Sequence, residues 1–282
     1  MAKVRLDTLL HRRGLYVSRS RAAAAVAAGE VRLGHAAEPA TKAGQLVAED
    51  VELTVVAGPR FVSRGGVKLA NALDALGVDP RARRCLDVGA STGGFTDCLL
   101  QRGADHVVAL DVAEGELDPA LRADPRVTVL ERANARALCP ADLPYAPELV
   151  VADVSFISLT KVLPAVLASA AERHDALAMV KPQFEVGPSR VGSGGVVRDP
   201  GDRRAALVAV ARAARDHAGA AVLGFASSGL PGPKGNRETF VWLAEAGRAG
   251  ALDDAALVAA ADRADDEGAG GAVLAPVAGG AA

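Results

Sequence analysis

From residue 67 onward, short apolar runs alternate with amphipathic stretches, a pattern that is typical of an α/β domain. Mostly apolar runs of this kind, each followed by a turn, are the form expected of strands buried on both faces of a parallel sheet. The expected strands are 85–88, 106–110, 127–130, 149–152, 176–180, 221–225 and 239–243. The expected helices include 67–76, 163–170 and 202–217. We therefore predict a mostly parallel sheet of seven strands with helices on both faces.

The first 57 residues have a different pattern, which predicts a small α+β domain. Leu6, Leu9 and Leu10 give a short first helix an apolar face, and Ser18 is placed to cap a second helix. The remaining expected elements are the second helix at 19–28 and strands at 31–33 and 51–55. Glycine and proline then interrupt the pattern at Gly58-Pro59 and again at Gly65-Gly66. The predicted organisation is a first domain at 1–57, a linker at 58–66, a second domain at 67–250, and a C-terminal helix with a disordered tail at 251–282.

Charge divides the chain more clearly than its overall balance of −2 suggests. Residues 1–84 contain 14 Lys and Arg against 8 Asp and Glu, whereas residues 85–282 contain 18 against 26. A basic front end on an acidic body indicates that the front end meets a polyanion.

Three scattered cysteines, Cys85, Cys98 and Cys139, fit neither a disulfide framework nor a zinc site. No apolar run approaches the roughly 20 residues of a membrane helix. We therefore expect a cytoplasmic protein with no metal and no membrane partner, present as a monomer or weak dimer.

A glycine-rich turn follows the strand at 85–88, and an acidic residue, Asp111, ends the next strand. The glycines are Gly89, Gly93 and Gly94. They allow a sharp turn and the close approach of a ligand, and Asp111 is placed where a nucleotide-binding βαβ unit bonds a ribose. Thr92 or Thr96 is expected to cap the helix that follows. A plain βαβ unit without a ligand is the alternative interpretation.

Polar residues also end the later strands. Asn134 and Asp153 follow the third and fourth strands, and Lys181 follows the fifth. Because ligands lie outside the carboxyl ends of parallel strands, these residues should meet at one edge of the sheet. Asn134 is a candidate for reading an adenine edge, with a simple turn residue as the alternative.

Four ionisable residues from separate stretches form a candidate catalytic set: Lys68, Asp153, Lys181 and Glu238. The turn at 87–94 reads D-x-G-x-x-x-G-G and resembles the first motif of S-adenosylmethionine-dependent methyltransferases. Methyl transfer from the sulfonium of that cofactor to a ribose 2′-hydroxyl would require loss of the hydroxyl proton as attack proceeds. A second nearby cation favours a lysine that gives up its own proton and acts as the base. We assign the base to Lys181. Lys68 would either tune it or hold the 2′-oxygen, and the two carboxylates would orient the lysines. The glycine-rich loop at 187–195 is a candidate flap on the substrate side.

The N-terminal stretch R-L-D-x-x-L-x-x-R-G-L-x-x-S-R-x-x-A, followed by G-E-V-R-L-G, resembles the alpha-L RNA-binding motif. That module occurs in a ribosomal small-subunit protein, pseudouridine synthases and tyrosyl-tRNA synthetases. The resemblance implies arginines that face RNA phosphates. Together with the basic linker, it predicts RNA binding by Arg5, Arg13, Arg19, Arg21, Arg60 and Arg64.

The phrases S-R-G-G-x-K-L, D-V-G-A-S-T-G-G-F-T, A-D-V-S-F-I-S-L, K-P-Q-F-E and G-P-x-G-N-x-E closely resemble the TlyA family. Its members are ribosomal RNA 2′-O-methyltransferases, also called haemolysin A-like, with an FtsJ/RrmJ-type catalytic domain. The resemblance implies a Rossmann-like class I methyltransferase fold, S-adenosylmethionine as cofactor, and a catalytic tetrad on the four residues above. It also implies a cytidine ribose in ribosomal RNA as target, in the large subunit and in some members also the small one. The predicted cofactor-binding residues are Asp87, Gly89, Ala90, Ser91, Thr92, Gly93, Gly94, Phe95, Asp111, Asn134 and Asp153.

Three other functions stay open. A non-catalytic ribosome-assembly protein would have a broken tetrad or a lost glycine turn, and the sequence has both intact. A membrane-active haemolysin would need a spanning or strongly amphipathic cationic helix. A small-molecule O-methyltransferase would leave the basic first domain without a role.

Overall fold

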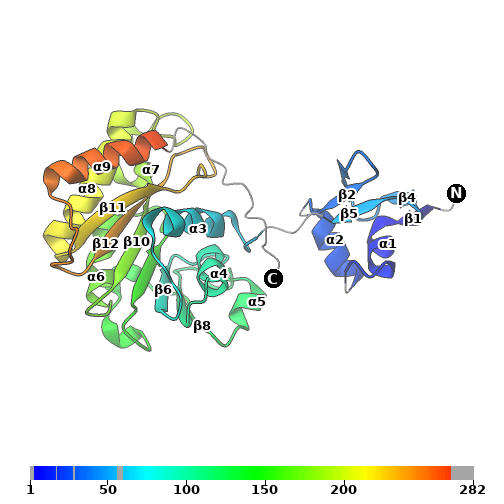
Figure 1. Cartoon of the computed structure of the whole chain (residues 1–282), viewed down its shortest axis with the longest axis horizontal. Helices are drawn as coiled ribbons and strands as arrows, with labels where there is room; N and C mark the ends of the chain where they lie inside the picture. Colours follow the sequence, from blue (N-terminus) through cyan, green and yellow to red (C-terminus); the bar gives the residue numbers. More distant parts are fainter. Residues whose placement is uncertain (1–2, 17, 28, 56–59, 268–282) are drawn as a thin grey trace. The chain divides into compact units, whose positions relative to one another are not determined.

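The computed structural model describes residues 3–16, 18–27, 29–55 and 60–267 (Figure 1). Its contacts divide the chain into a first unit, Met1–Arg60, and a second unit, Phe61–Ala282. The helix predicted near the C-terminus is α9, Asp254–Glu267. The predicted disordered tail falls at 268–282, outside the described residues.

The first unit contains two short helices and two small antiparallel sheets. The helices are α1 (Leu6–Arg12) and α2 (Arg19–Ala27). One sheet pairs β1 (Lys3–Arg5) with β4 (Leu46–Ala48), and the other has the order β3 (Glu38–Pro39), β2 (Val31–Leu33), β5 (Leu53–Val55). Leu6, Leu9 and Leu10 on α1 pack with Ala22 and Val26 on α2 in a small core of their own. The predicted apolar face of the first helix therefore forms the centre of this unit.

The second unit is built on a seven-stranded sheet with the strand order β11-β12-β10-β9-β6-β7-β8. The strands are β6 (Arg84–Val88), β7 (His106–Leu110), β8 (Val127–Leu130), β9 (Leu149–Ala152), β10 (Asp175–Val180), β11 (Ala221–Ser227) and β12 (Thr239–Ala244). Only β12 runs against its two neighbours among these seven strands. The predicted class I methyltransferase architecture, a mostly parallel sheet of seven strands, is confirmed.

Helices cover both faces of this sheet (Figure 1). One face packs against α3 (Arg64–Leu76) and α4 (Gly94–Gln101), and the other packs against α6 (Leu163–Ala168), α8 (Pro200–Ala218) and α9. In β9, Leu149 and Val151 enter the first core while Val150 and Ala152 enter the second. Side chains alternate between the faces of a strand, so a strand with two covered faces must be apolar throughout.

Two local expectations were wrong. The helix expected from Val67 begins at Arg64, because the Ser63 hydroxyl accepts a hydrogen bond from the Gly65 amide and caps the helix there. The stretch 61–66, placed in the predicted linker, therefore lies in the second unit. Neither threonine caps α4: its N-cap is Gly93, whose φ is +94°. Several short elements were not expected from the sequence: β1, β3, β4, α5 (Pro119–Arg122), α7 (Pro182–Glu185) and four 3-10 turns.

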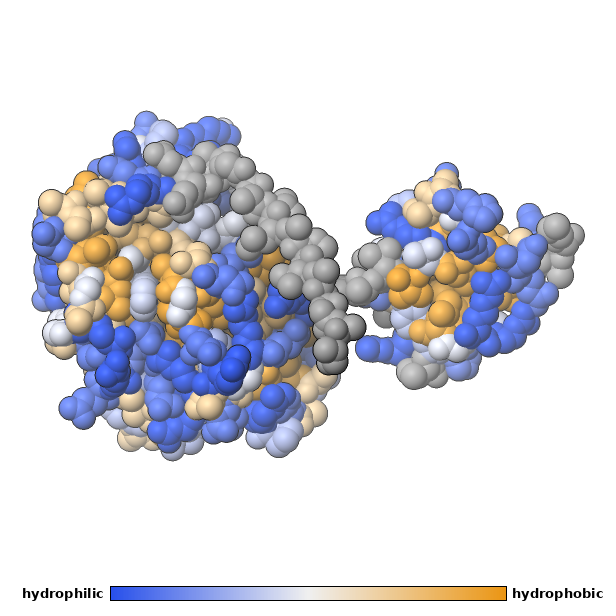
Figure 2. Space-filling model, in the orientation of Figure 1, coloured by the Kyte–Doolittle hydropathy of each residue, from blue (hydrophilic) through white to orange (hydrophobic). Residues whose placement is uncertain are grey.

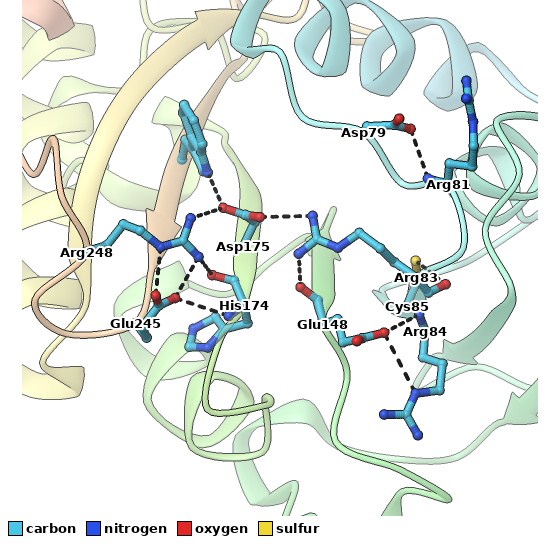
Figure 3. Close-up of polar contacts among 11 residues, drawn as sticks. Asp79, Arg81, Arg83, Arg84, Cys85, Glu148, His174, Asp175, Glu245 and Arg248 are labelled. Atoms are coloured by element: carbon cyan, nitrogen blue, oxygen red, sulfur yellow. Dashed lines mark hydrogen bonds and ion pairs between the residues drawn. The ribbon is translucent and has the colours of Figure 1, made fainter.

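At the edge where the parallel strands begin, a network of ion pairs ties neighbouring strands together (Figure 3). We call this edge the amino rim, and its residues are Arg83, Arg84, Glu148, His174, Asp175, Trp242, Glu245 and Arg248. The Asp175 carboxylate lies 2.9 Å from Arg83 Nη1 and accepts hydrogen bonds from Trp242 Nε1 (2.9 Å) and Arg248 Nη1 (3.3 Å). Arg248 also forms two hydrogen bonds to Glu245, and these hold the pKa of that carboxyl down at about 2. Both Asp175 oxygens are thus satisfied by permanent donors.

The surface seen in Figure 2 is mostly hydrophilic, with apolar residues emerging in patches between polar ones. Among the described residues, none of the helices is long and apolar enough to cross a membrane. Of the large apolar side chains that the structure describes in the second unit, that of Phe156 is the most exposed, at 92%.

Candidate functional site

The glycine turn after β6 brings the backbone of two parallel strands into close contact. Gly89 has a φ of +84°, and a Cβ atom built on it would lie 2.6 Å from the carbonyl oxygen of Asp153 after β9. A side chain at this position would be strained and would also displace Asp153. We call the edge formed by Gly89, Asp111, Asp153 and Lys181, which directly follow β6, β7, β9 and β10, the carboxyl rim.

Asp87 lies beneath the turn and not in the cleft, which differs from its predicted place among the cofactor contacts. Its side chain is fully buried, and Oδ2 accepts hydrogen bonds from the amide (2.9 Å) and hydroxyl (2.7 Å) of Thr96 on α4. The other oxygen, Oδ1, has no hydrogen-bond partner among the described residues. Burial raises the pKa of Asp87 to about 7, against the opposing effect of the Thr96 hydrogen bonds. Gly93 is also buried. A side chain there would collide with Leu117 and Leu121, so this position requires glycine for packing.

A pocket of about 540 Å³ opens at the ends of β7 and β8. Its wall includes Asp111 and Asn134. Asp111 accepts hydrogen bonds from the Ser91 amide and the Ala113 amide, both at 2.8 Å, so the turn and the strand end are held together. The Asn134 side chain accepts a hydrogen bond from the Arg136 amide, so it serves a turn and lines the pocket at once. Glu116, which the sequence did not single out, binds the Ser91 hydroxyl at 3.1 Å and lines the same wall.

The four residues of the candidate tetrad form two ion pairs. Lys68 on α3 is hydrogen-bonded to Glu238, and both side chains are buried, with 7% and 2% of their surface exposed. Lys181 Nζ lies 2.5 Å from Asp153 Oδ1. Asp153 Oδ1 nevertheless has no hydrogen-bond partner among the described residues, and the lysine instead donates to the Ser155 hydroxyl at 2.9 Å. We interpret the contact with Asp153 as electrostatic, so the carboxylate oxygen can still accept a hydrogen bond.

Both pairs meet in a second pocket of about 290 Å³, next to the first. All four tetrad residues line it, together with the predicted contacts Gly89, Ala90, Ser91, Thr92, Gly94 and Phe95, and with Arg64. Gly89, Ser91, Asp153 and Ser155 line both pockets. The structure therefore brings together tetrad residues that are up to 170 positions apart in the chain.

A third pocket of about 320 Å³ adjoins the tetrad. Lys181, Glu238 and Ser155 belong to its wall as well as to that of the second pocket. Phe156 and Phe184 also line it, with ring centroids 5.3 Å apart. Phe156 has a φ of +63°, which is unusual for an aromatic residue. Phe156 was not singled out from the sequence, because nothing in the sequence indicates that this aromatic side chain is exposed.

Glu185 joins the two loops that carry Asp153 and Lys181. Its carboxylate accepts hydrogen bonds from the Ser158 hydroxyl (2.6 Å) and the Leu159 amide (2.9 Å). Burial raises the pKa of Glu185, while these two hydrogen bonds oppose the shift. Glu185 therefore fixes the segment after Lys181 relative to the segment after Asp153.

Most of the arginines predicted to bind RNA in the first unit already have internal partners. Arg5 is hydrogen-bonded to Asp7, and this contact keeps the pKa of that carboxyl well below its usual range. Arg19 lies 3.5 Å from the same carboxylate, and Arg13 donates to the carbonyl groups of residues 49 and 51. Arg21 is exposed, and its guanidinium has no partner among the described residues. Arg64 is exposed at the second pocket.

Among the described residues, no group of three or more His, Cys, Asp or Glu side chains is placed to hold a metal ion. The three cysteines are free, with two of them buried. The site therefore offers two lysines, two carboxylates and hydroxyl groups for acid–base chemistry beside a glycine-lined cleft.

Comparison with known proteins agrees with this arrangement. Residues 61–245 match the FtsJ-like methyltransferase family, and residues 4–53 match the S4 domain. The chain is 51% identical over 243 residues to the 16S/23S rRNA (cytidine-2′-O)-methyltransferase TlyA of Mycobacterium tuberculosis, covering 86% of this chain and 90% of that protein. It is 39% identical to Hemolysin A of Brachyspira hyodysenteriae, covering 70% of this chain and 81% of that protein.

The solved structure of a protein from Streptococcus thermophilus that is named as a hemolysin is similar in fold along nearly the whole chain. It has a TM-score of 0.71 at 35% identity and covers 95% of this chain and 97% of that one. The predicted resemblance is thereby confirmed: the chain belongs to the TlyA family of FtsJ-like methyltransferases with an N-terminal S4 domain.

Proposed function

We propose that the protein transfers a methyl group from S-adenosylmethionine to the 2′-hydroxyl of a cytidine in ribosomal RNA. The observation that carries this proposal is the meeting of two lysine–carboxylate pairs in one pocket beside the glycine turn. The substrate class is supported by the S4 unit and by the relative that acts on cytidine in 16S and 23S rRNA. Methylation of the large subunit, with the small subunit as a second target, is the form we propose.

The residues around the turn fit this cofactor. Gly89 lets the turn pack closely against the backbone after β9, because a Cβ there would lie 2.6 Å from the Asp153 carbonyl oxygen. Asp111 is the acidic residue that would bind the ribose hydroxyls. Asn134 lies farther along the first pocket, where the adenine would be read. The cofactor supplies an electrophilic methyl on a sulfonium, and the chain must then handle the proton of the RNA hydroxyl.

Lys181 is the group we assign to that proton. It must give up one proton before the reaction, and the neighbouring Asp153 and Ser155 are positioned to hold the amine toward the pocket. As the 2′-oxygen bonds to the methyl carbon and the carbon–sulfur bond breaks, the hydroxyl proton passes to Lys181 Nζ. General base catalysis of this kind contributes about 10²–10⁴ in rate.

The second pair has a different task. Lys68 is held by Glu238 in a buried position across the same pocket. Its positive charge would stabilise the negative charge that develops on the 2′-oxygen, and a fixed cation away from water is effective at this. Glu238 balances that charge in the absence of RNA and fixes the direction of the ammonium group.

The third pocket gives the target nucleotide a place next to the tetrad. Phe156 and Phe184 offer an aromatic surface against which an unstacked base can pack. Arg64 beside the second pocket and Arg21 in the first unit are cations placed for phosphate groups.

The test is incubation of the purified protein with methyl-labelled S-adenosylmethionine and ribosomal subunits that lack the modification. We expect label in RNA at a cytidine, and resistance of the following phosphodiester to alkali, because a 2′-O-methyl group removes the hydroxyl that attacks it. Label at a base, or alkali-sensitive labelled positions, would contradict ribose methylation. Binding of subunits and cofactor without label would favour the assembly protein, and leakage of dye-filled liposomes would favour the haemolysin.

A further inference from the structure

Asp265 on helix α9 does not line the third pocket, yet its hydrogen bonds lead toward two segments that do. Asp265, 3% exposed, accepts two hydrogen bonds from Arg203 on α8, at 2.6 and 2.7 Å. We propose that Asp265, through Arg203 and Arg237, is a positioning residue that sets the third pocket for the target nucleotide. This inference rests on the proposed methyl transfer.

One connection reaches Arg198, just beyond the glycine-rich loop at 187–195. Arg203 Nη1, which is not used by Asp265, donates to the carbonyl oxygen of Arg198 at 2.7 Å. Val191 and Gly195 of this loop line the third pocket. The direction of the Arg203 fork is set by its two bonds to Asp265, so the carboxylate also sets where the end of the loop is held.

The other connection reaches the segment that carries Glu238. Arg237 Nη1 donates to the backbone carbonyl of Asp265 at 3.2 Å, and the next residue is the partner of Lys68. Asn236, 2% exposed, closes the triangle: it accepts a hydrogen bond from the Val197 amide (2.9 Å) and donates to the Gly195 carbonyl (2.7 Å). The loop, the tetrad segment and α9 are therefore bonded to one another.

A purely stabilising role explains this arrangement less well. Replacing a buried ion pair with apolar side chains of similar volume is often neutral for stability. What apolar side chains cannot supply is the directed bond from Arg203 to the Arg198 carbonyl. Displacement of a reacting group by about 1 Å can lower a rate by as much as 10²-fold. The Arg203–Asp265 pair is therefore expected to affect the geometry of the third pocket more than the stability of the fold.

The test compares Arg203→Met/Asp265→Leu with the control Arg212→Met/Asp254→Leu, which removes an exposed pair between the same two helices. Full-length proteins are assayed below their melting temperatures for methyl transfer to ribosomal subunits, and for amide hydrogen exchange. We expect kcat to fall about 10- to 100-fold in the first variant, with unchanged affinity for S-adenosylmethionine. Exchange in 192–198 should quicken, and the control should match wild type in both readouts.

Several outcomes would overturn the proposal. These are wild-type kcat in the folded first variant, an equal loss in the control, or unchanged exchange in 192–198. If the first variant does not fold, Arg203→Lys replaces it, since it keeps a positive charge beside Asp265 and loses the fork that reaches Arg198. A wild-type rate in Arg203→Lys would then refute the proposal. If wild-type protein methylates no ribosomal RNA, the proposed function fails, and the exchange experiment still decides whether Asp265 holds the loop.

Discussion

Ion pairs lie at both rims of the seven-stranded sheet, but the two rims use different cations. At the amino rim, Asp175 is surrounded by Arg83, Arg248 and the Trp242 indole. At the carboxyl rim, Asp153 faces Lys181, and in the same pocket Glu238, which directly precedes β12, faces Lys68. A guanidinium does not lose its proton in proteins, whereas a lysine can, so the first kind of pair only joins strands and the second can exchange protons.

The two rims also differ in how completely their carboxylates are satisfied. Asp175 Oδ1 accepts hydrogen bonds from Trp242 and Arg248, and Oδ2 lies 2.9 Å from Arg83 Nη1. Asp153 Oδ1 has an ammonium nearby but no hydrogen bond, and Asp87 Oδ1 below the turn has none among the described residues. Buried polar groups without partners destabilise a fold, so the oxygens of Asp87 and Asp153 indicate where function was favoured over stability. At the amino rim the His174 Nε2 atom also lacks a partner among the described residues, but the carboxylates there do not.

The largest effect is expected from removal of the buried lysine–carboxylate pair. In Lys68→Met/Glu238→Leu, the rate of methyl transfer should fall at least about 100-fold, because the cation facing the developing charge is lost. The free energy of unfolding should change by less than about 1–2 kcal/mol, since apolar substitutes often replace a buried pair without loss. Single-turnover rates and urea unfolding measure the two quantities. A large loss of stability with an unchanged rate would mean that this pair only stabilises the fold, as the ion pairs of the amino rim do.

The opposite result is expected at the amino rim. Asp175→Ala leaves Arg83 and Arg248 without their shared partner, and this should lower the free energy of unfolding by about 3 kcal/mol. The rate of methyl transfer by the folded protein should stay within about two-fold of wild type. A strong fall in that rate, in protein verified as folded by circular dichroism, would contradict the separation of the two rims.

Asp87 should give the second unit an unusual dependence of stability on pH. Its carboxyl has a pKa of about 7 in the folded protein because it is buried, against about 3.9 when unfolded. A raised pKa means that the folded state holds the proton more tightly, so ionisation destabilises the fold. The cost is absent below about pH 4, grows between about pH 4 and 7, and is complete above that, reaching about 4 kcal/mol at most.

The matched variant for this effect is Asp87→Asn, which cannot ionise. Relative to wild type, it should gain stability as the pH rises from 5 to 8, as followed by urea unfolding. A difference between the two proteins that does not vary with pH would show that Asp87 stays ionised in the fold.

The smallest effect extends the comparison to the first unit, where Arg13 is internally bonded and Arg21 is not. Arg21→Ala should lower the slope of log K against log salt for RNA binding by about one, the value for one lost phosphate contact. Arg13→Ala should mainly reduce the stability of the unit, because two carbonyl groups lose their donor. Filter binding across a salt series, with thermal unfolding, measures both. Equal changes in salt slope would mean that the internal bonds of Arg13 break when RNA binds.

The sequence predicted the framework well because its signals are local and repeated. The strands after residue 84 were placed to within one or two residues, since runs such as 127–130 are apolar and bounded by turns. Lys181 and Asp153 were expected at one edge because the ends of neighbouring parallel strands converge.

The missed features depend on contacts between distant segments. The hydroxyl of Thr96 was expected at a helix cap but binds Asp87, which becomes clear only when the helix is packed on the strand. The tethers from Asp265 and Glu185, and the exposure of Phe156, likewise have no periodic signal in the sequence. Short strands such as β3 have two residues, too few for an alternating pattern.

The most direct test of the difference between the rims is the single-turnover rate of Lys181→Arg at saturating S-adenosylmethionine, with RNA and cofactor binding verified. Arginine keeps the positive charge opposite Asp153 but cannot accept the proton of the 2′-hydroxyl. We predict a rate at least about 100-fold below wild type with both ligands still bound. A rate within a few-fold of wild type would mean that the position needs only a cation, and would contradict the assignment of Lys181 as the base.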